Sequence, residues 1–257
     1  MRWVMAEGAV NRLARFGAKE TRLHEAVLDA GHELITFKWE GENTYLSHIP
    51  DNCVPTVVYA GHESLDFLRA FRPDLMPGIF HDKELNSAEM VNAELGEVAL
   101  NASGVMRPTR DIKFTELPLF IRPSLSDKSF NGGVVKDEQT LKSLPDEIVL
   151  TSDVQDILSE YRFIVINGEV VTGSQYARDK QMDVRIDYLD ECFDMAAHAA
   201  SIYAPMGAFA CDVAETESGP KVIEYNGFST SGLYACDGRK IVRAMEEMMS
   251  RLASPEP

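Results

Sequence analysis

Cysteine is scarce in this sequence, and the cysteines that are present lie far apart. There are four, Cys53, Cys192, Cys211 and Cys236, and no two of them form a CxxC pair. This spacing favours neither a zinc site nor a disulfide framework, and it is typical of proteins in a reducing compartment. We therefore expect a cytoplasmic protein whose cysteines are small buried hydrophobic residues or bystanders.

Long apolar runs are also missing. No stretch of about eighteen consecutive apolar residues occurs, which a membrane-spanning helix would require. The opening segment, MRWVMAEGAVNRLARFG, lacks a continuous apolar core of signal-peptide length. The sequence therefore predicts neither a membrane anchor nor a membrane partner.

Basic residues are too few for a general nucleic-acid binder. The chain has 25 lysines and arginines against 41 acidic residues, which gives a formal net charge of −16. Such a charge repels phosphate backbones at long range, although a local basic pocket for one small anion is compatible with it. The composition, with 45% hydrophobic and 26% charged residues, is that of a soluble globular protein.

The common catalytic signatures are absent as well. The sequence has no glycine-rich Rossmann fingerprint, no GxxxxGK[ST] loop, no GxSxG and no HExxH, and its histidines are scattered. No nucleophilic triad is visible either.

The first hundred residues alternate between strand and helix patterns, which favours a parallel sheet with helical crossovers. Strands are expected at Arg2–Met5, Glu33–Trp39 and Val54–Ala60, and helices at Ala18–Ala30, Ser64–Phe71 and Ser87–Leu95. The pattern then changes to antiparallel hairpins, one of them around Asn167-Gly168, the strongest short hairpin signal. We predict an α/β domain over residues 1–105 and an α+β domain over 106–257.

The segment ACDVAETESGPKVIEYN carries the strongest chemical signal. If it forms a hairpin that is symmetric about Ser218, Asp212 lies opposite Glu224. Asn226 shares one strand face with Glu224, so three oxygen-bearing side chains converge. Mg²⁺ prefers such carboxylate and amide oxygens, and the carboxylates would repel each other without a cation. The alternative is an exposed acidic hairpin that binds no metal.

Two further segments carry charges suited to a nucleotide. In LPLFIRPSLSDKSFNGG, a strand ending at Arg122 leads into a polar loop with Lys128 and two glycines, which suits a polyphosphate. In EYRFIVINGEVVTGSQYAR, Glu160 and Arg162 share one face of a strand and suit a ribose hydroxyl and a phosphate or carboxylate. Taken alone, the first could be an ordinary hairpin loop and the second a cross-strand ion pair.

The order of these segments resembles the ATP-grasp domain. A strand with a cationic loop, a short strand, a Glu/Arg hairpin and a D…ExN hairpin follow one another over about 110 residues. The closing segment VIEYNGFSTSGLYACD is especially similar to an ATP-grasp subgroup in which FIRP brings arginine where other members have lysine. The resemblance implies an α/β N-terminal domain plus an α+β ATP-grasp fold that holds its nucleotide between two α+β subdomains.

The resemblance also implies roles for individual residues. Arg122 and Lys128 would contact the phosphates of ATP, and Arg162 would face the transferred phosphoryl group or the acyl phosphate. The backbone of Ser152, Asp153 and Val154 would read the adenine edge.

On the same grounds, Glu160 would lie near the ribose. Asp212, Glu224 and Asn226 would hold Mg²⁺. Arginine at position 122 keeps the charge of the usual lysine but changes the donor geometry.

The chemistry implied by the family is ATP-dependent ligation. A carboxylate attacks the γ-phosphate to give an acylphosphate and ADP, and an amine or related nucleophile then displaces phosphate. We expect an amino acid or peptide-like substrate. A small-molecule phosphotransferase and a non-catalytic nucleotide-binding regulatory module stay open as alternatives, and the sequence decides neither the substrates nor the oligomeric state.

Overall fold

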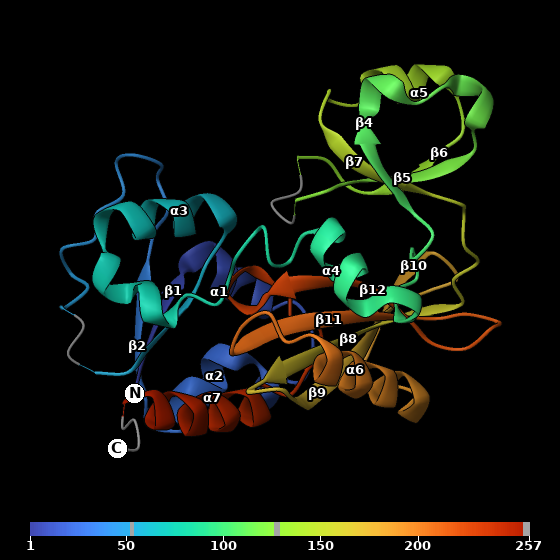
Figure 1. Ribbon diagram of the computed structural model, residues 1–257. Coiled ribbons are helices and arrows are strands. Elements are labelled where there is room, and N and C mark those ends of the chain that lie inside the picture. Colours follow the sequence, from blue (N-terminus) through green and yellow to red (C-terminus); the bar gives the residue numbers. More distant parts are fainter. Residues whose placement is uncertain (52–53, 126–128, 254–257) are drawn as a thin grey trace.

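The computed structural model of the chain describes residues 1–51, 54–125 and 129–253. Within them, the strands form three sheets that lie in separate parts of the molecule (Figure 1). Short 3₁₀ turns occupy Lys19–Thr21, Pro73–Gly78, Gly96–Val98, Thr109–Asp111, Phe114–Glu116 and Phe228–Thr230. No helix in these described ranges is long and apolar enough to cross a membrane.

The N-terminal part is a small parallel sheet with helices, as the alternating pattern predicts. Its strands are β1 (Arg2–Ala6), β2 (Glu33–Phe37) and β3 (Thr56–Tyr59), in the order β2-β1-β3. The helices are α1 (Glu7–Leu13), α2 (Leu23–Asp29) and α3 (His62–Phe71). The buried strand residues and the apolar faces of the helices form one core.

The helix expected over Ala18–Ala30 is wrong in its first half. Arg22 is extended, with φ −69° and ψ 138°, and separates a 3₁₀ turn from α2. The apolar residues that suggest the helix all fall within or next to α2, so the pattern never covered residues 18–22. Gly238 packs so closely here that an added Cβ would lie 2.6 Å from the carbonyl oxygen of Thr21.

A second sheet, five-stranded and antiparallel, lies at the centre of the molecule. It contains β8 (Ser159–Ile166), β9 (Glu169–Arg178), β10 (Gln181–Arg185), β11 (Ala208–Glu215) and β12 (Lys221–Gly227), in the order β10-β9-β8-β11-β12. The predicted hairpin turn has φ of 52° at Asn167 and 81° at Gly168, the left-handed conformations that a tight hairpin needs. Helices α4 (Ala88–Leu95) and α6 (Asp190–Ile202) pack on one face and form a core with it.

A third, smaller lobe extends away from this sheet (Figure 1). It contains β4 (Val105–Pro108), β5 (Leu119–Pro123), β6 (Gly133–Val135) and β7 (Ile148–Ser152), in the order β4-β7-β5-β6, with helix α5 (Glu138–Ser143). Its own core is small and includes Ile121 and Val149. This lobe and the N-terminal part both lie on the other face of the five-stranded sheet.

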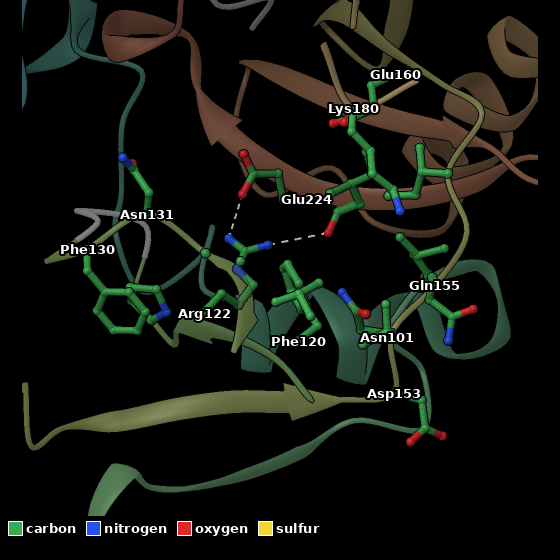
Figure 2. A pocket seen from close by; sticks show the side chains of 18 of the residues that line it. Asn101, Phe120, Arg122, Phe130, Asn131, Asp153, Gln155, Glu160, Lys180 and Glu224 are labelled. Carbon is green, nitrogen blue, oxygen red and sulfur yellow. Dashed lines mark hydrogen bonds and ion pairs between the residues drawn. The ribbon is translucent and has the colours of Figure 1, made fainter. Parts of the chain in front are cut away.

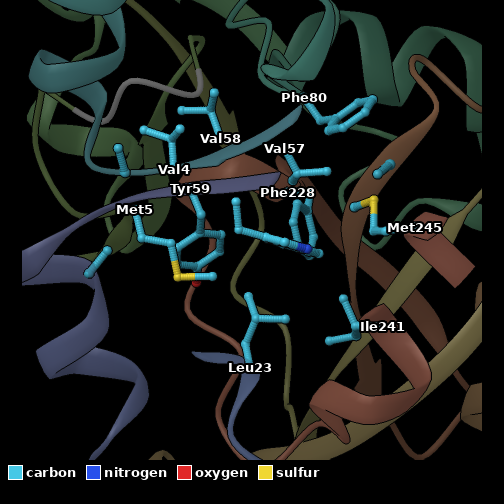
Figure 3. Packing of buried hydrophobic residues seen from close by; sticks show 14 of the residues in the cluster. Val4, Met5, Leu23, Val57, Val58, Tyr59, Phe80, Phe228, Ile241 and Met245 are labelled. Carbon is cyan, nitrogen blue, oxygen red and sulfur yellow. The ribbon is translucent and has the colours of Figure 1, made fainter. Parts of the chain in front are cut away.

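The C-terminal helix joins the N-terminal core. Helix α7 (Gly238–Ala253) lies beside α2 and buries Ile241 and Met245 in the cluster that contains Phe228 (Figure 3). Phe228 directly follows β12 and packs edge-on against Trp3, at 6.4 Å between ring centroids. The end of the acidic hairpin is therefore anchored in the hydrophobic core of the N-terminal part.

Candidate active site

A cavity of about 770 Å³ opens between the small lobe and the five-stranded sheet (Figure 2). This volume lies within the range of small-molecule and cofactor pockets. β5, β6 and the segment after β7 form one wall, and β8, β9 and β12 form the other. The lining residues on which the site depends are Leu100, Asn101, Phe120, Arg122, Phe130, Asp153, Val154, Ile157, Glu160, Tyr176, Lys180, Ile223 and Glu224.

The residues predicted from the sequence divide into two sets around this cavity. Those that line it are Arg122, Asp153, Val154, Glu160 and Glu224. Those that lie beneath or beside its lining are Ser152, Arg162, Asp212 and Asn226, each of which is buried. Lys128 falls outside the described residues. Ser152 stabilises the wall of the cavity, because its hydroxyl donates a hydrogen bond to Oδ1 of the lining residue Asn101 at 2.8 Å.

The pairing expected within the acidic hairpin is confirmed: Asp212 lies opposite Glu224. The pairing arises from a β-bulge, because Val213 pairs with Val222 and the register then shifts by one residue. The extra residue is Ile223, and in a bulge two consecutive side chains point to nearly the same face. Ile223 and Glu224 accordingly both line the cavity, whereas Val222 and Tyr225 are buried in the core.

Asp212 and Glu224 each pair with an arginine, one from the same sheet and one from the small lobe. Arg162 lies directly opposite Asp212 and binds it through two parallel hydrogen bonds, Nε to Oδ1 at 2.7 Å and Nη2 to Oδ2 at 2.6 Å. Arg122 comes from the small lobe, and its Nη2 lies 2.6 Å from Oε2 of Glu224 (Figure 2). The Arg122–Glu224 pair therefore connects the two walls of the cavity, and both pairs are largely shielded from solvent.

Asn226 brings the two carboxylates to one point. Its Nδ2 donates to Oε1 of Glu224 at 2.8 Å and lies 3.4 Å from Oδ2 of Asp212. Rotation of this side chain by half a turn would bring its amide oxygen to the same point.

This donor set fits Mg²⁺. It offers only hard oxygen ligands, and a carboxylate oxygen bound to arginine keeps lone pairs for a metal. Among the described residues, no group of three His, Cys, Asp or Glu side chains could hold a metal. The third candidate ligand at this point is the amide of Asn226. The two arginines already neutralise the charges of the two carboxylates. The positive charge of a bound cation would therefore neutralise nucleotide phosphates.

Glu160 sits where the cavity meets β9. The phenolic hydroxyl of Tyr176 donates to Oε2 of Glu160 at 2.6 Å. Burial raises the pKa of Glu160 above its usual value, and the hydrogen bond from Tyr176 works in the opposite direction. The carboxylate therefore combines a fixed orientation with a partly desolvated position at the wall.

Arg162 is buried, and its guanidinium is held by several protein groups. Its Nη1 donates to the carbonyl oxygen of Gly232 at 2.8 Å, in addition to its two bonds to Asp212. The carboxylate partner raises the pKa of this guanidinium well above its usual value, against the effect of burial. Arg162 is thus a permanent counter-ion of Asp212.

Several lining residues were not predicted from the sequence. The apolar ones are Leu100, Phe120, Phe130 and Ile157, and the polar ones include Asn101 and Lys180. They come from loops and strand ends far apart in the chain, so no spacing rule connects them. Phe120 is the exception, because it stands two residues before Arg122 on the same strand and so faces the same side.

Comparison with known proteins gives the family. The family model "ATP-grasp domain, R2K clade family 2" matches residues 103–244, which is more than half of the chain. The chain belongs to this family, and the resemblance noted in the sequence is confirmed. No curated protein sequence matches significantly.

Solved structures agree on the fold. D-cycloserine synthetase DcsG is 11% identical, with a TM-score of 0.66 over 97% of this chain and 100% of that one. D-alanine–D-alanine ligase from Bacillus anthracis is 12% identical, with a TM-score of 0.62 over 100% of both chains. The ATP-grasp ligase PsnB is 13% identical, with a TM-score of 0.58 over 96% of this chain and 98% of that one.

Identities this low establish the fold alone. They confirm the predicted architecture of an α/β N-terminal part followed by an α+β ATP-grasp fold. The predicted class, an ATP-dependent ATP-grasp enzyme, agrees with the family and with this fold.

Proposed function

We propose that this protein is an ATP-dependent carboxylate–amine ligase acting on a small-molecule or peptide-like substrate through an acylphosphate. The observation that carries the proposal is the contact between Arg122 of the small lobe and Glu224 of the acidic hairpin, at 2.6 Å, inside one cavity. A cation that suits phosphates and a carboxylate that suits Mg²⁺ thus meet between two α+β lobes.

The rest of the lining supports a nucleotide in this cavity. Leu100, Phe120 and Ile157 offer apolar surface for a purine base, next to the exposed residues Asp153 and Val154. Glu160 offers an acceptor for a ribose hydroxyl. We propose that Arg122 binds the phosphates, which would compete with Glu224 for its guanidinium because both partners are anionic.

Asp212, Glu224 and Asn226 are the residues that would hold Mg²⁺. When bound, the ion supplies neutralisation of the charge that develops on the phosphate oxygens. Release of Glu224 from Arg122 would leave that carboxylate available for the metal at the moment when Arg122 turns to the phosphates. Nucleotide and metal binding would then support each other.

The reaction proceeds in two displacements. An oxygen of the substrate carboxylate attacks the γ-phosphorus, the bond to the β-bridging oxygen breaks, and ADP leaves. The amine nitrogen then attacks the acyl carbon, the bond from that carbon to the phosphate oxygen breaks, and the amine loses a proton to solvent. Positioning and charge neutralisation by the protein suffice for such a phosphoryl transfer, without a covalent catalyst.

The test is an ATP turnover screen against pooled amino acids, short acids and amines, with product detection by mass spectrometry. A ligase releases ADP and phosphate and forms an amide only when carboxylate and amine are both present. With hydroxylamine in place of the amine, it gives a hydroxamate. Formation of AMP and pyrophosphate would contradict the proposed chemistry.

Two other outcomes identify the alternatives. A stable phosphorylated product with no hydroxamate would indicate a phosphotransferase. A chain that binds Mg²⁺ and ATP but turns over no member of the pool, and whose cellular phenotype survives Asp212→Asn with Glu224→Gln, would be a nucleotide-binding regulatory module.

A further inference from the structure

The segment 232–237, which follows the acidic hairpin, encloses Arg162. The carbonyl oxygen of Gly232 accepts from Nη1 of Arg162 at 2.8 Å. The ring centroid of Tyr234 lies 5.1 Å from Cζ of the same arginine. Further along, Sγ of Cys236 lies 3.6 Å from the carbonyl oxygen of Arg162, as a weak donor. One short segment therefore contacts both the guanidinium and the backbone of this residue.

Tyr234 does not act on Arg162 alone. Its ring stacks on Tyr176 at 4.8 Å between centroids and 10° between planes, and the Tyr176 ring lies 5.7 Å from Cζ of Arg162. A guanidinium beside two aromatic rings is held by cation–π attraction, which is strongest where water is excluded. The Tyr234 ring also lies near Phe16 of the N-terminal part, at 5.9 Å between ring centroids. These ring contacts link the N-terminal part to the arginine that holds Asp212.

The backbone of Tyr234 is in an unfavourable conformation that its surroundings maintain. Its φ is 48°, in the left-handed region that disfavours a bulky residue. The flanking residues Leu233, Ala235 and Cys236 are all buried, so the strain is imposed by packing on both sides. The packing therefore holds the aromatic ring of Tyr234 against Arg162 despite that strain.

We propose that Tyr234 is a positioning residue for the metal site. Its ring fixes the guanidinium of Arg162, and Arg162 in turn fixes both oxygens of Asp212 in the orientation that Mg²⁺ requires. This inference rests on the proposed function, because it assigns a role within the same metal site. The ring is the part of Tyr234 that contacts Arg162, with its centroid 5.1 Å from Cζ.

The test measures nucleotide binding and needs no turnover. The affinity for ADP is determined by calorimetry with Mg²⁺ and with a chelator, for the wild type and for Tyr234→Phe, Tyr234→Ala and Tyr234→Gly. Glycine adopts the left-handed backbone without strain, so Tyr234→Gly keeps the local conformation if the alanine variant fails to fold. Tyr45→Ala is the matched control, because Tyr45 is 72% exposed in the connection between β2 and β3.

The alanine and glycine variants are expected to lose about tenfold of the Mg²⁺-dependent affinity, the size of one desolvated cation–π contact. Their affinity in chelator stays unchanged, and Tyr234→Phe and Tyr45→Ala bind as the wild type does. Wild-type Mg²⁺ dependence in folded Tyr234→Gly would overturn the positioning role, as would a phenylalanine variant as weak as the alanine one. A wild type whose ADP binding is indifferent to Mg²⁺ would overturn the proposed metal site itself.

Discussion

The buried pair Arg162–Asp212 gives a prediction about stability that can be worked out from its geometry. The carboxylate of Asp212 is 2% exposed and the side chain of Arg162 is 8% exposed, and two parallel hydrogen bonds join them. In Arg162→Met the arginine is replaced by an apolar side chain, and the carboxylate stays behind without its counter-ion. In Asp212→Asn the positively charged guanidinium of Arg162 stays behind without its carboxylate.

Breaking a buried ion pair from one side costs about 3–5 kcal/mol, because an uncompensated charge remains in a poorly solvated place. For a chain of this size, that corresponds to a fall in Tm of roughly 6–10 °C. The double variant Arg162→Met/Asp212→Asn leaves neither charge, so its loss is expected to be smaller than the sum of the single losses by about 2 kcal/mol or more.

The assay is urea unfolding followed by circular dichroism and fluorescence, with coincident transitions as the condition for using free energies. The cycle is repeated for Arg122→Met and Glu224→Gln, a matched pair whose carboxylate side chain is more exposed, 13% against 2% for Asp212. Losses at Arg162 and Asp212 that add within about 0.5 kcal/mol would refute the reasoning, because additivity means that the two side chains act independently.

Three further predictions concern single positions. In Gly173→Ala the new methyl group overlaps the neighbouring phenylalanine ring on β8, so we expect a loss of about 1–3 kcal/mol in urea unfolding, while Gly8→Ala, with open space around it, loses nothing. In Tyr176→Phe the pKa of Glu160, already raised by burial, rises further because a hydrogen bond to the carboxylate is removed. The loss of ADP affinity on acidification should therefore begin at a higher pH, and an unchanged pH profile would contradict the ribose role. Burial beside a second histidine lowers the pKa of His81 to about 4. Because the unfolded chain binds this proton near pH 6.5 and the folded chain does not, His81 weakens stability as pH falls from 6.5 to 4, and His81→Gln should show a smaller decrease in Tm over that range.

The sequence was sufficient for elements whose signals are local. The parallel N-terminal sheet follows from the alternation of strand and helix patterns over the first hundred residues. The Asn167-Gly168 turn and the facing of Asp212 and Glu224 each follow from the pattern of a single hairpin segment. The pairing of Asp212 with Glu224 was predicted correctly, but for an incomplete reason. Symmetry about Ser218 gives the correct pair, but the turn itself is one residue out of that register, and the bulge at Ile223 restores it.

The features that were missed depend on contacts between distant segments. Nothing near Arg122 in the chain indicates that it pairs with Glu224, about a hundred residues later. The contacting rings of Phe16, Tyr234 and Tyr176 join three separate segments in the same way. Helices α1 and α5 and strands β4 and β10 were not predicted. All of them are short, and tertiary packing decides such elements more than propensity does.

The most direct test of the central claim follows oxygen through the reaction. Once a carboxylate substrate is found in the turnover screen, it is labelled with ¹⁸O in both carboxylate oxygens, and the inorganic phosphate released is examined by mass spectrometry. Ligation through an acylphosphate predicts ADP together with phosphate that carries one ¹⁸O, and Asp212→Asn and Glu224→Gln should suppress both. Unlabelled phosphate formed alongside the amide would contradict the account, because the carboxylate would then never have been joined to the γ-phosphoryl group.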